Sequence, residues 1–68
     1  MNIILNGKPH SLENTTTIEQ LIDQLGLAGK RVAVEVNLDI IPRSEHGQRL
    51  LNENDKVEVV HAIGGGTL

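Results

Sequence analysis

The most strongly patterned stretch of this 68-residue chain is TIEQLIDQLG, residues 17–26. Thr17 and Gln20 have the spacing of a capping box, in which the two side chains bond reciprocally to the backbone at the start of a helix. Apolar residues then recur at the i, i+3, i+4, i+7 spacing of one helical face: Ile18, Leu21, Ile22 and Leu25. Gly26 is a typical residue just after a helix end. An amphipathic helix with one apolar stripe must pack against a flat partner, and a β-sheet is the obvious candidate.

Strand patterns flank this helix on both sides. Before it, residues 2–6 and 8–12 are expected to pair as a hairpin, because Asn6-Gly7 is a strong signal for a two-residue turn. After it, residues 31–36 alternate β-branched side chains, residues 39–41 form a short strand stopped by Pro42, and residues 56–63 form the last strand. Residues 44–51 are ambiguous between a helical turn and a loop.

The predicted element order is therefore β-β-α-β-(β)-β, with Val32, Val34 and Val36 facing inward on the strand after the helix. Such an order in a small chain indicates an α+β layer, one sheet covered on one face by one helix. The pattern leaves the order of the strands within the sheet open.

The composition limits what so small a chain can be. It has 38% apolar side chains, no cysteine and no aromatic residue, so we expect one aliphatic core without disulfides or thiolate metal sites. A net charge of −3, with no basic patch and no stacking aromatics, argues against a nucleic-acid binder. No apolar run approaches the roughly 18 residues of a membrane span, and no signal peptide is recognisable. We expect a cytoplasmic domain that is a monomer when free.

The glycines Gly64, Gly65 and Gly66 follow directly on the last strand. A glycine-rich end is commonly a flexible terminus, and we divide the chain into a domain of residues 1–63 and a flexible tail of residues 64–68. A phosphate-binding loop is a poor alternative, because such a loop runs into a helix and only two residues follow here. A backbone arm without Cβ atoms suits entry into a narrow tunnel. A carboxylate at Gly66 would be an unhindered acyl group.

Several segments together resemble the ThiS family of sulfur carrier proteins, which act in thiamin thiazole biosynthesis. The similarity spans nearly the whole chain, and the segments that carry it are, by residue number, 32–35 (VAVE), 37 (N), 40–44 (IIPRS), 54–60 (NDKVEVV) and 63–66 (IGGG). The resemblance implies a ubiquitin-like β-grasp fold, with one mixed sheet of four to five strands and one main helix. This agrees with the element order predicted above.

The resemblance also implies a function without a catalytic site on this chain. In that family a ThiF-like, E1-like enzyme uses ATP to adenylate the terminal glycine carboxylate, here that of Gly66. A sulfur donor then converts the adenylate to a thiocarboxylate, and a ThiG-like thiazole synthase takes the sulfur. The chain is therefore expected to be a protein cosubstrate with no tightly bound cofactor.

Thr67 and Leu68 depart from the family pattern, which ends at the glycines. Either a processing protease removes the dipeptide, or the two residues do not belong to the natural chain, or this copy carries no sulfur. We take Gly66 as the acyl residue.

A docking surface is predicted from strand alternation. Glu58 is expected to face water, which places Val60 and Ala62 on the same face, while Ile4 faces outward from the first strand. If the first and last strands are neighbours, as in the β-grasp fold, these side chains form an exposed apolar patch beside the tail. Ile63, next to the glycines, is included among the expected partner-binding residues.

The remaining candidates are weaker. His10, His46 and His61 lack metal-ligand spacing and are expected at the surface, and no catalytic triad or carboxylate pair stands out. Three other functions stay open: a MoaD-like carrier for molybdopterin synthesis, a ubiquitin-like modifier of lysines, and a β-grasp binding module that never uses its tail. The approach to the glycines does not look like that of the MoaD-like family.

Overall fold

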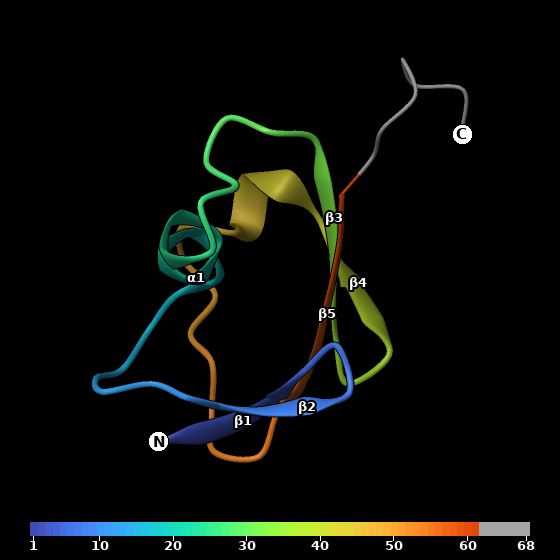
Figure 1. The fold of residues 1–68 in the computed structure, drawn as a ribbon. Coiled ribbons are helices and arrows are strands. Elements are labelled where there is room, and N and C mark those ends of the chain that lie inside the picture. Colours follow the sequence, from blue (N-terminus) through green and yellow to red (C-terminus); the bar gives the residue numbers. More distant parts are fainter. Residues whose placement is uncertain (62–68) are drawn as a thin grey trace.

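One mixed sheet and one helix make up the fold in the computed structural model, which describes residues 1–61 (Figure 1). The elements in chain order are β1 (Asn2–Leu5), β2 (Lys8–Ser11), α1 (Ile18–Gln24), β3 (Val32–Val36), β4 (Asp39–Ile41), a 3₁₀ turn (Arg43–Glu45) and β5 (Lys56–His61). The strand order is β2-β1-β5-β3-β4. β1 and β5 are parallel, and the other neighbouring strands are antiparallel. The α+β class is confirmed, and the ambiguous stretch after Pro42 begins with a short 3₁₀ turn.

The ends of α1 form as the sequence predicts. The Thr17 side chain accepts a hydrogen bond from the Gln20 backbone N–H at 3.1 Å, and the Gln20 Oε1 accepts one from the Thr17 N–H at 2.9 Å. Two of the otherwise unpaired donors at the helix start are satisfied in this way. The helix is followed by Gly26 in the left-handed region, at φ +75°.

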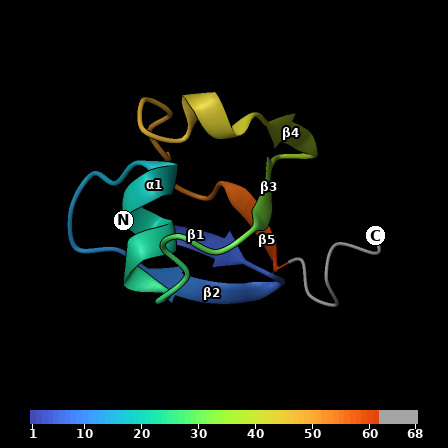
Figure 2. The same ribbon diagram turned by 90° about the horizontal axis from the view of Figure 1, so that it is seen from above.

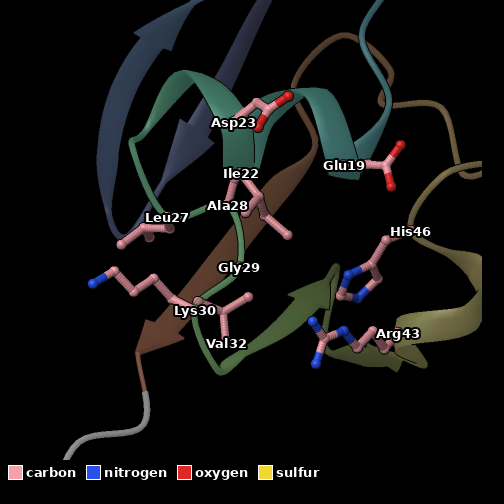
Figure 3. A pocket seen from close by; sticks show the side chains of 10 residues that line it. All are labelled: Glu19, Ile22, Asp23, Leu27, Ala28, Gly29, Lys30, Val32, Arg43 and His46. Carbon is pink, nitrogen blue, oxygen red and sulfur yellow. The ribbon is translucent and has the colours of Figure 1, made fainter.

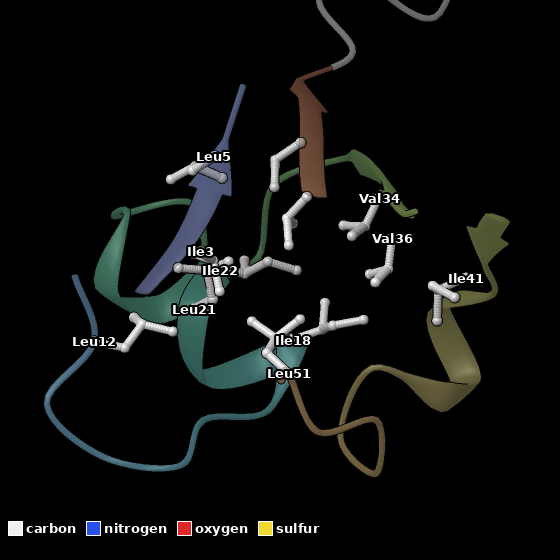
Figure 4. Close-up of a cluster of buried hydrophobic side chains, with 12 residues drawn as sticks. Ile3, Leu5, Leu12, Ile18, Leu21, Ile22, Val34, Val36, Ile41 and Leu51 are labelled. Carbon is white, nitrogen blue, oxygen red and sulfur yellow. The ribbon is translucent and has the colours of Figure 1, made fainter. Parts of the chain in front are cut away.

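The helix packs its apolar stripe against one face of the sheet (Figure 2). Ile18, Leu21 and Ile22 are buried, and Figure 4 shows them among side chains of β1 and β3. All members of this core are aliphatic, in agreement with the composition: Ile3, Leu5, Leu12, Ile18, Leu21, Ile22, Val34, Val36, Ile41, Leu51, Val57 and Val59. The inward direction predicted for Val34 and Val36 is confirmed, and Val32 is half-buried at the margin.

Two tight turns have positive φ at both central residues. Asn6 and Gly7, at φ +50° and +82°, join β1 to β2 as predicted. Asn37 and Leu38, at φ +52° and +74°, join β3 to β4. Leucine is an unusual residue in the left-handed region, because its Cβ crowds the backbone there. The Leu38 side chain gains no compensating burial, since it is 83% exposed.

The β3–β4 turn is tied to the start of β5 by buried Asp55. Its Oδ1 accepts from the Asn37 side-chain amide at 3.0 Å, and its Oδ2 accepts from the Asn52 N–H at 2.8 Å. The Asn37 Oδ1 accepts in turn from the Lys56 N–H at 2.9 Å. This network satisfies the polar groups at the point where β5 enters the sheet.

Replacing Asp55 by alanine is expected to lower the free energy of unfolding by about 1–3 kcal/mol, because the Asn37 amide and the Asn52 N–H lose their acceptors. Urea unfolding monitored by far-UV circular dichroism measures the change. Asp39→Ala, at an exposed position, is the matched control. Equal stability of the two variants would contradict the role assigned to Asp55.

Replacing Leu38 by glycine is expected to raise the free energy of unfolding by about 0.5–1 kcal/mol, because glycine adopts positive φ without steric cost. The same urea titration measures this. Leu50→Gly is the control, since Leu50 is also an exposed leucine but has no positive φ. An equal loss of stability in both variants would show that Leu38 is not strained.

Candidate functional site

The face of the sheet opposite α1 is left open by the described elements (Figures 1 and 2). The strand registers determine which outward side chains lie side by side on it. Across β3 and β5, Ala33 is paired with Val60 and Glu35 with Glu58. Across β3 and β4, Glu35 is paired with Ile40. Two adjacent rows of side chains result, which we call the open-face surface: Ala33, Glu35, Ile40, Glu58 and Val60.

The alternation predicted for the last strand is confirmed. Val57 and Val59 are buried, whereas Glu58 and Val60 are exposed. Val60 leaves 57% of its surface in solvent, next to exposed Ala33. An apolar side chain so exposed near the end of the last strand is available for contact with a partner.

The prediction that Ile4 and Val60 lie side by side is wrong. β1 does lie beside β5, but the register pairs Ile4 with Lys56. Val60 comes four residues later along β5, which is about 13 Å at the usual rise per residue. Glu58 lies between them on the same face, and Ile4 is only half-exposed. The cause is the early end of β1, whose last paired residue is opposite Val57, so β5 continues beyond it.

The tail and the residues before it lie outside the described residues: Ala62, Ile63, Gly64, Gly65, Gly66, Thr67 and Leu68. Their roles stay predictions from the sequence. The structure places the preceding residue, His61, at the end of β5, opposite Val32 of β3. The segment therefore follows a strand in the middle of the sheet, between β1 and β3.

The sequence analysis did not single out three residues of the open-face surface. The outward direction of Ala33 and Glu35 could have been predicted, because these residues alternate with the inward valines of β3. Ile40, which is 74% exposed, required the register between β3 and β4. An isoleucine in a short apolar run gives no local indication of the face that it occupies.

A separate pocket of about 300 Å³ lies on the helix side of the molecule (Figure 3). Its apolar lining includes Ile22, Leu27 and Val32, and charged side chains of both signs surround it: Glu19, Asp23, Lys30 and Arg43. It contains none of the residues predicted to bind partners. Within residues 1–61, no group of three or more potential ligands could hold a metal ion.

His46, which also lines this pocket, is buried, so its predicted surface position is wrong. Its Nε2 donates a hydrogen bond to the carbonyl oxygen of Ile41 at 3.0 Å. Because a carbonyl oxygen only accepts, Nε2 must carry the hydrogen. The ring closes the 3₁₀ turn onto the end of β4. In contrast, His61 is exposed as predicted and His10 is half-exposed. No helix among the described residues has the length and apolar character needed to cross a bilayer.

Comparison with known proteins gives one consistent family. A sequence model described as the ThiS family matches residues 3–66. A sulfur carrier protein ThiS from Bacillus subtilis is 38% identical over 63 residues, which cover 91% of this chain and 96% of that protein. A thiazole synthase from Magnetococcus marinus is 50% identical over 66 residues, and one from Paramagnetospirillum magneticum is 40% identical over 67. This chain spans only about a fifth of the length of those two proteins.

A solved structure shows the same fold. The crystal structure of the thiamine biosynthesis protein (ThiS) from Geobacter metallireducens is 29% identical to this chain and superposes with a TM-score of 0.82. The match covers 97% of this chain and 100% of the other. The β-grasp architecture that the sequence resemblance implies is thereby confirmed.

Proposed function

This chain belongs to the ThiS family, and we propose that it acts as a sulfur carrier in thiamin biosynthesis. The observation that carries the proposal is the extent of the family match, which runs from the first strand to Gly66 and includes all three tail glycines. The named sulfur carrier from Bacillus subtilis is similar over almost its whole length. The chain then works as a cosubstrate of other enzymes.

The proposed chemistry takes place at the Gly66 carboxylate. A carboxylate is a poor electrophile, so a ThiF-like enzyme first transfers AMP from ATP to it and releases pyrophosphate. A donor at the sulfide level then attacks the acyl carbon, AMP leaves, and a thiocarboxylate forms. Glycine suits this position because no side chain hinders the attack. ATP and the sulfur donor are substrates of the partner enzyme, and no resident cofactor is needed.

The proposed acceptor of the sulfur is a ThiG-like thiazole synthase. Two relatives named thiazole synthase contain a segment similar to this chain within a much longer protein. A carrier and an acceptor in one polypeptide meet at a high effective concentration. This organisation supports the pairing of the present chain with a synthase.

The proposal also includes a cytoplasmic location, a monomeric free state and a protease that removes Thr67 and Leu68.

The open-face surface is suited to contact with the adenylating enzyme. Val60 is exposed near the end of the strand that leads into the tail, and Ala33 lies beside it. An enzyme that acts on the tail must hold the domain close to this end of β5. We therefore propose this surface, with Ala62 and Ile63, as the partner-binding region. The structure removes the reason for assigning Ile4 to the same patch.

Intact-mass spectrometry tests the carrier function. In the protein purified from its own cells, we expect a chain that ends at Gly66. Incubation with the ThiF-like enzyme, ATP and a sulfide source is expected to add the mass difference between sulfur and oxygen. A chain that ends at Gly65 is the control and is expected to stay unchanged. Persistence of Leu68 without ATP-dependent adenylation would overturn the proposal, and attachment to lysines would indicate a modifier.

Replacing Val60 by aspartate is expected to leave folding intact, because the side chain is largely in solvent. It is expected to lower kcat/KM for adenylation at least about tenfold, since a charge would be buried in an apolar contact. ATP–pyrophosphate exchange measures this. Leu50→Asp, at an exposed leucine outside the open-face surface, is the matched control. Equal kinetics for Val60→Asp and the unmodified protein would exclude Val60 from the interface.

A further inference from the structure

Two glutamates are directly paired across neighbouring strands on the open-face surface. Glu35 of β3 and Glu58 of β5 are register partners, and both side chains project away from the core. Directly paired residues on neighbouring strands have Cβ atoms about 4.5–5.5 Å apart. Like charges at this separation destabilise the sheet. We therefore expect Glu35 and Glu58 to repel each other in the free protein.

Apolar side chains frame this glutamate pair. Ile40 continues the same row on the β4 side of Glu35, and Ala33 and Val60 form the next row. Ile40 and Val60 expose 74% and 57% of their surfaces. The nearest cation along β5 is Lys56, which lies on the same face two residues before Glu58 and is paired with Asn37 through the backbone. The surface thus consists of two adjacent glutamates, with apolar side chains on the β4 side and toward the end of β5 and with Lys56 toward its start.

We propose that this surface docks a partner protein that places an arginine, surrounded by apolar side chains, between Glu35 and Glu58. The proposal rests on the carrier function above and assigns the arginine to the ThiF-like adenylating enzyme. One docking event relieves both unfavourable features, because the cation removes the repulsion and the apolar residues cover Ile40 and Val60. The observation that selects this occupant is the glutamate pair beside exposed Ile40 and Val60, because a cation flanked by apolar side chains complements both features.

Arginine fits the geometry better than the alternatives. Its planar guanidinium carries five N–H donors and is able to bond two carboxylates at once. A divalent metal is a poorer occupant, because a calcium ion takes six to eight oxygen ligands and no group of three potential ligands exists among residues 1–61.

The same arrangement provides specificity. A partner that covers this surface without a cation would bury two unpaired carboxylates, which costs far more than leaving them in water. The two glutamates therefore disfavour binding of a partner without a cation, in addition to favouring a partner that has one.

The double variant Glu35→Gln/Glu58→Gln tests the proposal. We expect its urea unfolding midpoint to rise, because the repulsion between β3 and β5 is removed. We expect its Kd for the purified ThiF-like enzyme of the same organism to increase at least about tenfold in isothermal titration calorimetry. The salt dependence of binding should flatten as well, since the ion pairs are lost. A more stable protein that binds less well is a result that damage to the fold does not produce.

The matched control is Glu13→Gln/Glu45→Gln, which removes the same net charge at exposed positions outside the open-face surface. We expect it to bind as the unmodified protein does. Equal Kd values for the two double variants would overturn the inference, and so would weaker binding accompanied by a lower unfolding midpoint.

Thiocarboxylate formation separates this inference from the carrier function. Unmodified protein that gains sulfur, with a Glu35→Gln/Glu58→Gln variant that binds the enzyme equally well, would overturn the docking inference alone. Unmodified protein that binds through the glutamates but never gains sulfur would overturn the carrier function alone.

Discussion

The parallel pairing of β1 with β5 is the interaction on which the rest of the structure depends. The backbone N–H groups of Ile4 and Asn6 donate to the carbonyls of Asp55 and Val57, at 2.8 and 2.9 Å. These bonds hold the last strand between the first strand and β3. A parallel neighbour requires a long connection, and the helix and the β3–β4 hairpin lie within it. The end of the described chain consequently lies in the middle of the sheet.

The central position of β5 explains the division of the molecule into two faces. Its inward residues, Val57 and Val59, meet the aliphatic stripe of α1, and its outward residues face no described element. With one helix for one sheet, one face must stay in solvent. The exposed Val60 and Ile40 on this face would lose contact with water only if a partner covered them.

Short polar side chains complete the hydrogen bonding at both ends of β5. The Asn6 side chain accepts from the Val59 N–H at 2.9 Å, just where β1 has ended and can no longer pair. Asp55 and Asn37 perform the corresponding task at the other end of the strand. Short polar side chains thus complete the hydrogen bonding of a strand that is longer than its neighbour β1. With its hydrogen bonds completed, β5 keeps the register that places Val60 and Glu58 on the open face.

The sequence by itself determined the features that depend on a few adjacent residues. The capping box, the helix stripe, the Asn6-Gly7 turn and the alternation of β3 and β5 were all predictable, because backbone bonding and side-chain direction are local. The tertiary structure alone decided which outward residues are neighbours. It placed Ile4 beside Lys56, brought Glu58 against Glu35, turned Ile40 outward and buried His46. Strand register and the closure of a loop onto the core arise from residues far apart in the chain, and only the packing of the whole domain selects among the alternatives.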